Sequence, residues 1–183
     1  IQGLGSVGGH LAGYLIERGA KVFGCDIDSE AIAEAEDKGV EIVPPGEIFD
    51  VDCDVFAPCA MGAVLNEDTI PRLKCKVVAG AANNQLKDDK QHADMLDQRG
   101  ILYAPDFVIN AGGLINVYNE LLGSYNQERA LRMTRGIYLN LTRVFEIAKR
   151  DSIATAKAAD RVAEERIATV QKMGSKHWGR LLD

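Results

Sequence analysis

The feature that most constrains the fold is a glycine pattern at the start of the chain. The opening residues "IQGLGSVGGHL" place Gly3, Gly5 and Gly8 in the order GxGxxG. In a strand–turn–helix unit the first glycine makes the turn, the second lets a pyrophosphate approach the backbone, and the third lets the helix pack against the strand. Such a pattern normally follows a strand of about five or six residues. Only Ile1 and Gln2 precede it here, so we expect a first strand that is truncated.

Short apolar segments that predict strands alternate with helical segments downstream of the glycines. The predicted strands are rich in Val, Ile and Ala without regular apolar–polar alternation, which is typical of parallel strands covered on both faces. Strands are expected at residues 21–26, 40–43, 53–58, 76–82 and 100–105, and helices at 7–18, 30–38, 66–74 and 88–100. This order predicts an α/β fold with a Rossmann-type, doubly wound, mostly parallel sheet.

From Ala111 onward the sequence pattern is entirely helical. In residues 126–151 apolar residues recur every three or four positions, which predicts one apolar stripe on a long helix. The stripe consists of Ala130, Met133, Ile137, Leu141, Val144, Phe145 and Ala148. A further charged helix is expected at 155–173, and the tail after Met173 is a candidate for disorder. We predict a Rossmann domain over residues 1–150, followed by a C-terminal helical extension and tail over 151–183 that lie between domains.

The charge and the apolar segments argue against several classes of function. The formal net charge of −6 and the pI of about 5.1 disfavour a partner with a phosphate backbone, because such binders carry a basic face. No apolar segment approaches the roughly 20 residues of a membrane span, and the first residues do not resemble a secretory leader. We therefore expect a cytoplasmic protein that binds neither nucleic acid nor a membrane.

The cysteines and histidines do not form a metal-binding pattern. Cys25, Cys53, Cys59 and Cys75 match neither paired zinc motifs nor a secreted disulfide framework. The three histidines lie far apart in the sequence. We predict free thiols in a reducing compartment and no metal site.

An acidic residue at the end of the second predicted strand completes the dinucleotide pattern. Asp26 follows the glycines by about 20 residues, the spacing at which a carboxylate accepts hydrogen bonds from ribose hydroxyls. A carboxylate there favours NAD over NADP, because it would repel a 2′-phosphate. Asp28 is the alternative for this contact, but it also suits a helix cap. The cofactor-binding residues predicted in this region are Gly3, Gly5, Ser6, Val7, Gly8, Asp26 and Ile27.

Three further segments each follow a predicted strand: "APCAMGAVLNEDTI", "VVAGAANNQL" and "YAPDFVINAGGLINV". The carboxyl ends of parallel strands meet at one edge of the sheet, so these segments should face the glycine loop. Together with "FEIAKRDSI" and "AADRVAEERI", they resemble the C-terminal, NAD-binding domain of the amino acid dehydrogenases that act on glutamate, leucine, phenylalanine and valine. The resemblance covers residues 1 to about 167 and is strongest to the leucine branch, with the phenylalanine branch next.

The resemblance implies a reaction and further site residues. An L-amino acid would give a hydride from its Cα to NAD⁺, and the imino acid would be hydrolysed to a 2-oxo acid and ammonia. Cofactor contacts are implied for Cys59, Ala60, Met61, Ala82, Asn83, Asn84 and Asn110, and substrate contacts for Asn84, Leu114 and Val117. An asparagine side chain can donate and accept, and can therefore orient a carboxamide. The alternatives are a turn-forming role for Asn83 and ordinary helix packing for Leu114 and Val117.

The resemblance also implies that the catalytic groups lie on an N-terminal domain with a GGxK segment, which this sequence lacks. No lysine here fits the role, and Lys87 is expected to be solvated at the start of a polar helix. We assign no catalytic residue and expect this chain to bind NAD without deaminating amino acids alone. The expected partners are an amino acid or 2-oxo acid, that N-terminal domain, and further copies in a homo-oligomer.

Two other functions fit part of the pattern. A regulatory NAD-sensing module of a potassium transport system also begins with glycines and an acid at the end of the second strand, and another kind of dehydrogenase can carry a C-terminal Rossmann domain. The pair "AGAANN" and "APDFVINAGG" favours an amino acid dehydrogenase. Within that family, an apolar wall favours a leucine, valine or isoleucine substrate, or phenylalanine, over glutamate, whose carboxylate would need a buried cation.

Overall fold

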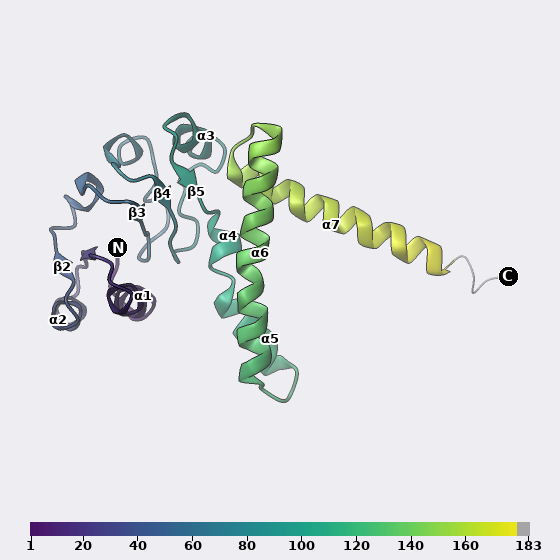
Figure 1. The fold of residues 1–183 in the computed structure, drawn as a ribbon, viewed down its shortest axis with the longest axis horizontal. Helices are drawn as coiled ribbons and strands as arrows, with labels where there is room; N and C mark the ends of the chain where they lie inside the picture. The colour runs from purple at the N-terminus through teal and green to yellow at the C-terminus, as the bar shows by residue number, and fades with distance from the viewer. Residues whose placement is uncertain (179–183) are drawn as a thin grey trace.

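The computed structural model describes the backbone of residues 1–178 and the side chains of residues 1–172. An α/β body forms the N-terminal part of the chain, and helices form the rest (Figure 1). Parallel pairing joins β1 (Phe23–Gly24) to β2 (Glu41–Ile42), and joins β4 (Val77–Val78) to both β3 (Val55–Phe56) and β5 (Leu102–Tyr103). The predicted α/β class with a parallel sheet is confirmed.

Gln2 lies between the two groups of strands and links them. Parallel bridges join it to Cys25, just after β1, and to Pro58, just after β3. The Gln2 amide donates to Ala57 O at 3.0 Å, and the Cys59 amide donates to Gln2 O at 2.7 Å. The order across the sheet is therefore β2, β1, the first residues of the chain, β3, β4 and β5, which is the order of a doubly wound dinucleotide-binding sheet.

The first two helices begin and end close to the predicted positions. Helix α1 (Ser6–Glu17) follows the glycine loop, and α2 (Ser29–Asp37) follows β1. The Asp28 carboxylate accepts hydrogen bonds from the Glu30 amide at 2.8 Å and from the Ala31 amide at 3.3 Å, so it caps α2. Its capping role, one of the two considered for Asp28, is thus visible in the structure.

The predicted helix at residues 66–74 is wrong. The structure has a compact turn followed by a single 3₁₀ turn, η2 (Ile70–Arg72), whereas η1 (Ile48–Asp50) and α3 (Gln91–Gln98) are the other short helices of this region. The Asn66 side-chain oxygen accepts from the amides of Asp68 and Thr69 at 3.0 and 3.1 Å. This local bonding competes with a helix, and Pro71 supplies no amide donor to extend one.

The core has a large cluster under β3, β4 and β5 and a smaller one under β1 and α1. In the large cluster Leu65, Ile70, Val78 and Leu96 have no exposed surface. The smaller cluster contains Leu4, Ala12, Val22, Ala35, Val40 and Ala57. Each strand is paired over only two residues, so packing of these apolar side chains, rather than long ladders of hydrogen bonds, holds the sheet and its covering helices together.

The C-terminal part consists of α4 (Asp106–Ile109), α5 (Gly112–Leu121), α6 (Gln127–Asp151) and α7 (Thr155–Trp178). The predicted long helix is confirmed, but its apolar stripe is buried unevenly. Ala130, Val144 and Ala148 are buried, whereas Met133 is 37% exposed. The C-terminal half of α6 packs on α7, where Ala158 is fully buried, and this contact completes the third apolar cluster.

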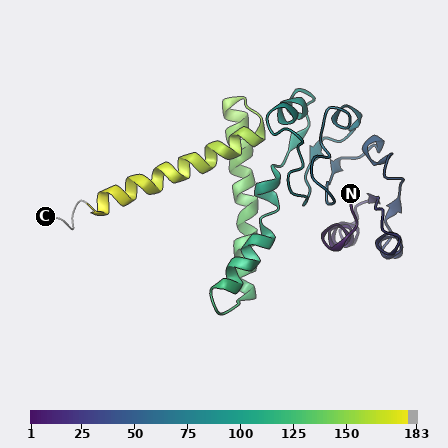
Figure 2. The ribbon, with the colours of Figure 1, turned by 180° about the vertical axis from the view of Figure 1, so that it is seen from behind.

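Helix α7 leaves the body and extends away from it (Figures 1 and 2). Its first turns pack against α6 and β5, and the Thr155 hydroxyl donates to Tyr103 O at 2.7 Å. The helix continues past Met173 to Trp178, and the rest of the tail, for which disorder was considered, lies outside the described residues. Across the described helices, none combines the length and apolarity that crossing a membrane requires.

The Asp151 carboxylate joins the end of α6 to α7. It accepts hydrogen bonds from Arg150 Nε at 2.7 Å and Arg150 Nη2 at 2.9 Å, and it also contacts Arg161 of α7. Hydrogen bonding by Arg150 is the main reason that the pKa of Asp151 falls to about 2. The ordinary pKa is 3.8, so the ionised form is favoured in the folded protein.

We expect this pairing to stabilise the fold only while Asp151 is ionised. Because the folded pKa lies below the ordinary value of 3.8, the contribution is present above that pH and is lost as the pH falls toward about 2. Asp151→Asn should lower Tm at neutral pH, and its gap to wild type should close on acidification. Thermal unfolding followed by circular dichroism checks this, with Asp160→Asn, an exposed change on α7, as the control. A pH-independent gap would contradict the prediction.

Candidate functional site

The three glycines of the first loop are required for three different reasons. Gly3 has φ +96°, and a Cβ there would lie 2.7 Å from the Cβ of Ala60. A Cβ on Gly8 would lie 1.9 Å from the Gly3 carbonyl oxygen. At Gly5 no protein atom lies within 4 Å of such a Cβ. The first and third glycines therefore serve close packing within the protein, whereas the second leaves an open space in front of the loop.

That open space lies at the N-terminus of α1. Gly5 is the N-cap residue, no side chain caps the helix, and its first turn contains no acidic residue. The first amides of a helix lack intrahelical partners and carry the positive end of its dipole. Ser6 and Val7 begin this turn, so the predicted loop residues surround a position that suits a phosphate group.

The Asp26 carboxylate lies beside the same loop. One oxygen accepts from the Leu4 amide at 2.6 Å, and the other accepts from the amides of Ile27 and Asp28 at 2.7 and 3.0 Å. Partial burial opposes ionisation, but these three N–H donors outweigh it and hold the pKa of Asp26 below its ordinary value. Asp26 is therefore an oriented, ionised acceptor, while the neighbouring Ile27 side chain is 94% exposed.

A cavity of about 710 Å³ opens at the carboxyl ends of the strands. It is lined by Val7 of the glycine-loop helix, by the segment after β4, by α4 and the start of α5, and by α6. Five residues predicted for the site line this cavity: Val7, Asn83, Asn84, Asn110 and Leu114. Segments that are far apart in the sequence thus meet at one edge of the sheet, as expected for parallel strands.

Backbone contacts hold the segment after β4 against the loop after β3. Asn84 adopts a left-handed conformation with φ +50°, and its carbonyl accepts from the Ala63 amide at 2.7 Å. A Cβ on Gly62 would lie 2.8 Å from the Asn84 carbonyl oxygen. The Asn110 side-chain amide donates to Asn83 Oδ1 at 2.5 Å. Asn83 is therefore more than a turn former, because its side chain contacts a second residue of the site.

The other residues predicted for the site do not line this cavity. Gly5 and Ser6 line a smaller cavity of about 250 Å³ between α1 and α2. Met61 is 77% exposed on the loop after β3, and Val117 is 49% exposed on α5. The remaining members, Gly3, Gly8, Asp26, Ile27, Cys59, Ala60 and Ala82, belong to neither lining. The structure therefore groups Leu114, but not Val117, with the asparagines.

Several residues of the cavity wall were not predicted from the sequence. Asp106 and Phe107 line it from α4, and Thr134 and Ile137 line it from α6. Asp106 Oδ2 accepts from the Gln85 amide at 2.8 Å and so ties α4 to the segment after β4. Its position directly after a predicted strand end was the available signal. Thr134 and Ile137 gave no comparable signal, because the packing of α6 on α4 and α5 cannot be read from the sequence of the helix itself.

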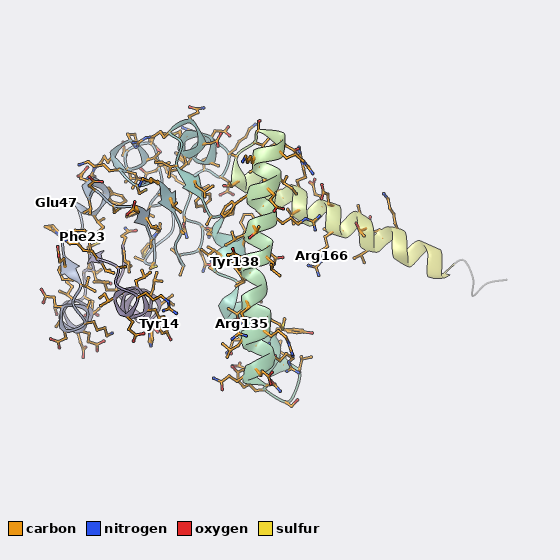
Figure 3. All side chains as sticks on the ribbon, viewed as in Figure 1. Tyr14, Phe23, Glu47, Arg135, Tyr138 and Arg166 are labelled. Carbon is orange, nitrogen blue, oxygen red and sulfur yellow. The ribbon has the colours of Figure 1, made fainter. Side chains whose placement is uncertain are left out.

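The wall of the cavity combines apolar side chains with amide groups and one carboxylate. Leu114 is 74% exposed and Phe107 is 57% exposed, and none of the residues that line the cavity is a lysine. Other exposed side chains of α6, such as Arg135 and Tyr138, can be followed in Figure 3. Within residues 1–172 there is also no group of three His, Cys, Asp or Glu side chains placed to hold a metal ion.

This arrangement can bind a ligand that carries phosphate, sugar and amide-bearing groups. The uncapped helix end suits phosphate, the oriented Asp26 carboxylate suits ribose hydroxyls, and the side chains of Asn83 and Asn110 suit a carboxamide. The space in front of Gly5 is where a pyrophosphate can approach the backbone. The residues present therefore fit a dinucleotide.

Comparison with known proteins gives related sequences and folds. The leucine dehydrogenase of Thermoactinomyces intermedius is 55% identical over 176 residues, which cover 96% of this chain and 48% of that protein. The phenylalanine dehydrogenase of Caldalkalibacillus thermarum is 44% identical, with coverage of 96% and 48%. The crystal structure of L-tryptophan dehydrogenase from Nostoc punctiforme superposes with a TM-score of 0.89 at 48% identity and covers 92% of this chain and 51% of that one.

The chain spans about half the length of the curated relatives that it matches. The sequence profile described as Glutamate/Leucine/Phenylalanine/Valine dehydrogenase matches residues 25–174. This match includes Asp26, the segments after β3 and β4, and helices α4, α5 and α6 of the cavity wall, whereas the glycine loop and Val7 of α1 lie outside it. The chain therefore belongs to the glutamate, leucine, phenylalanine and valine dehydrogenase family.

Proposed function

We propose that this chain forms the NAD-binding part of an amino acid dehydrogenase that oxidatively deaminates an apolar L-amino acid. The observation that carries the proposal is the space in front of Gly5, bordered by an uncapped helix end and lying beside the oriented Asp26 carboxylate. It agrees with the family of the chain and with the names of its relatives, which are dehydrogenases of leucine, tryptophan and phenylalanine.

Different residues of the site would contact different groups of NAD. Amides of Ser6 and Val7 at the start of α1 would hold the pyrophosphate, and Asp26 would accept from the adenosine ribose. Asn83 and Asn110 would orient the carboxamide of the nicotinamide, with Asn84 beside its ribose. The bound cofactor would accept the hydride of the substrate, while these side chains decide which face of its ring is presented.

The wall around Leu114 supports an apolar substrate. A side chain of the leucine, valine or isoleucine type would contact apolar groups there, whereas a glutamate carboxylate would lack a cation among the cavity-lining residues. Phenylalanine is the alternative substrate, because Phe107 widens the apolar part of this wall. A module that only senses NAD is the alternative function, and it would bind the cofactor without any response to an amino acid.

The catalytic lysine and its acidic partner would come from a second, N-terminal domain of the same enzyme. This assignment rests on the family resemblance, and it agrees with a cavity whose lining residues include no lysine. Helix α7 would lie between the two domains, and the complete enzyme would form a homo-oligomer in the cytoplasm. By itself the chain would bind NAD and turn over no amino acid.

The test of cofactor binding is Gly5→Ala. Gly5 has φ −62° and ψ −162°, which alanine also adopts, and no protein atom would meet the new methyl group. We expect Tm to stay close to wild type and NADH affinity to fall about tenfold or more, because the methyl group occupies the space of the pyrophosphate. Fluorescence titration of NADH measures this, with Gly46→Ala, another glycine whose Cβ would meet no atom, as the control.

The substrate class is tested by NADH production from L-leucine, L-phenylalanine and L-glutamate with the complete protein. Turnover of the first two above glutamate supports the proposal. NADH binding with no turnover of any amino acid would favour the sensing module instead. Oxidation of L-leucine by residues 1–183 alone would refute the assignment of the catalytic groups to another domain.

A further inference from the structure

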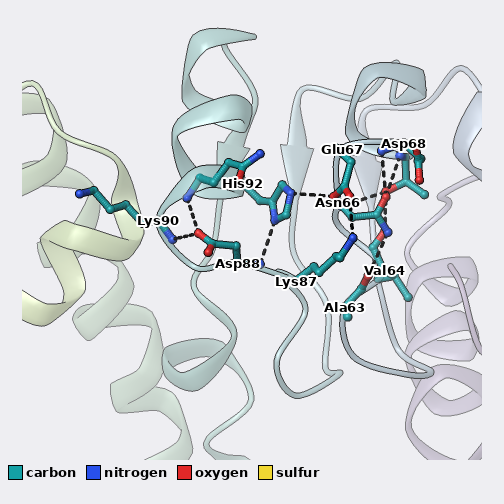
Figure 4. Close-up of polar contacts among 11 residues, drawn as sticks. Ala63, Val64, Asn66, Glu67, Asp68, Lys87, Asp88, Lys90 and His92 are labelled. Carbon is teal, nitrogen blue, oxygen red and sulfur yellow. Dashed lines mark hydrogen bonds and ion pairs between the residues drawn. The ribbon is translucent and has the colours of Figure 1, made fainter.

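A cluster of polar side chains joins the loop after β3 to the segment that leads into α3 (Figure 4). Glu67 is at its centre. One carboxylate oxygen accepts from Lys87 Nζ at 2.6 Å, and the other lies 3.2 Å from His92 Nε2. Hydrogen bonding by Lys87 is the main reason that the pKa of Glu67 falls to about 2. Lys87 is therefore paired, although its side chain is 53% exposed as expected, and it lies ahead of α3 rather than in its first turn.

His92 gives this cluster a defined orientation. Its side chain is only 2% exposed, although it is polar. The Asp88 amide donates to His92 Nδ1 at 2.9 Å, so Nδ1 is an acceptor and Nε2 carries the proton. That proton points to Glu67. The imidazole thus links the backbone just before α3 to the loop after β3, and both of its nitrogens are used.

The cluster continues directly into the candidate site. Leu65 and Leu86 form a parallel bridge, in which the Leu65 amide donates to Gln85 O at 3.0 Å and the Lys87 amide donates to Leu65 O at 3.0 Å. Two residues further along, the Ala63 amide donates to Asn84 O at 2.7 Å. The side-chain cluster and the left-handed turn at Asn84 are therefore the two ends of one short ladder between the loops.

The glycine loop packs on Cys59 and Ala60, at the start of the loop after β3, but neither it nor Asp26 has a hydrogen bond to the ladder residues 63–65 and 84–87. The contacts of Asp26 run to Leu4, Ile27 and Asp28, and α1 packs on β1 and α2. A change in the cluster should therefore displace the Asn84 end of the site and leave the phosphate and adenosine end in place. This separation distinguishes a positioning role from a general contribution to stability.

We propose that Glu67, Lys87 and His92 are positioning residues that hold the Asn83–Asn84 turn in the conformation that binds the nicotinamide half of the cofactor. The inference rests on the proposed function, which it deepens. The three side chains touch no ligand themselves. They act through the Leu65–Leu86 bridge. Removing them should weaken binding of the nicotinamide half of the dinucleotide, which the asparagines contact.

The test compares two ligands on the complete protein: NADH, which spans both halves of the site, and AMP, which lacks the nicotinamide half. The variants are Glu67→Ala, Lys87→Met and Lys87→Arg, since both residues are about half exposed and His92 is buried. Asp54→Ala and Lys76→Met are the matched controls, because Asp54 and Lys76 form a carboxylate–lysine pair at 2.8 Å ahead of β3 and β4, at the opposite edge of the sheet.

We expect Glu67→Ala to weaken NADH binding about fivefold and Lys87→Met about threefold, the scale of one or two lost charge-assisted hydrogen bonds at a partly exposed site. AMP affinity should stay unchanged in both, and Lys87→Arg, which keeps the ion pair, should bind NADH like wild type. The two control variants should bind both ligands normally.

Two results would overturn the inference. One is unchanged NADH affinity in Glu67→Ala. The other is an equal loss of NADH and AMP affinity together with a lower Tm, which would mark the cluster as a structural element alone. A wild-type protein that binds neither ligand would instead refute the proposed function, and the inference with it.

Discussion

Gly8→Ala is expected to abolish dinucleotide binding and to destabilise the fold. The new Cβ would stand 1.9 Å from the carbonyl oxygen of Gly3 and 3.3 Å from the Cβ of Cys59. The carbonyl oxygen belongs to the backbone, and a Cβ atom does not move when its side chain changes rotamer. Neither atom can therefore make room, and α1 must shift away from the sheet. Overpacking of this kind costs about 1–3 kcal/mol or more, and a shift of about 1 Å at the loop is enough for a loss of roughly 100-fold in function.

Gly13→Ala is the matched control for this experiment. Gly13 lies in the same helix, and its Cβ would meet no atom within 4 Å outside the backbone of that helix. Gly13 is partly buried, and alanine inside a helix is favoured over glycine by about 1 kcal/mol, so this variant should be slightly more stable and should bind NADH normally. Thermal unfolding and NADH titration of both variants provide the comparison. Normal NADH binding by Gly8→Ala would contradict the close packing described for the loop.

Asp26→Ala should cause the second large loss. The substitution removes the acceptor for the ribose hydroxyls and leaves the Leu4 amide, 2.6 Å from the carboxylate in the wild type, without its partner. Hydrogen bonds to a charged group contribute about 1.5–3 kcal/mol each, so NADH affinity should fall by roughly 100-fold. The preference for NADH over NADPH should fall as well, because the repulsion of a 2′-phosphate is gone.

Asp28→Ala separates the two acids that follow β1. Asp28 caps α2 through its contacts with the Glu30 and Ala31 amides. Loss of such a cap costs about 1 kcal/mol, so Tm should fall while NADH affinity stays within about twofold of wild type. Calorimetric titration of NADH and NADPH with both variants measures the difference. A greater loss of NADH affinity in Asp28→Ala than in Asp26→Ala would assign the ribose contact to Asp28.

Helices could be predicted from the sequence where residues at their own ends determine where they start and stop. Helices α1 and α2 follow from a glycine loop, a capping aspartate and glycines at their ends, and Gly19 and Gly39 indeed have φ +82° and +96°. The predicted helix at residues 66–74 was wrong. Apolar residues there have helical spacing, but the Asn66 side chain forms a turn with the amides that follow it and Pro71 interrupts helical hydrogen bonding. The spacing alone does not show which of these effects prevails.

The sequence predicted those residues of the candidate site that lie in the segments after the strands. Asn83 and Asn84 follow β4, Asn110 ends the short helix α4 that follows β5, and the structure brings all three to one cavity. The resemblance implied substrate contacts for both Leu114 and Val117, but only Leu114 lines the cavity. The contribution of Thr134 and Ile137 was not predictable, because it depends on where α6 folds back, and a helix sequence does not encode that angle by itself.

The sequence by itself determined the class of the fold and the chemistry of its first loop, because the spacing of glycines and of one acid constrains a backbone that lies within a single βαβ unit. The tertiary structure decided which distant segments share a wall and which side chains stand behind it. Gln2 completes the sheet with bonds to strands on both sides, and Glu67 reaches Lys87 and His92 across two loops. Such contacts join residues far apart in the chain, so packing of the whole domain, rather than any local pattern, selects them.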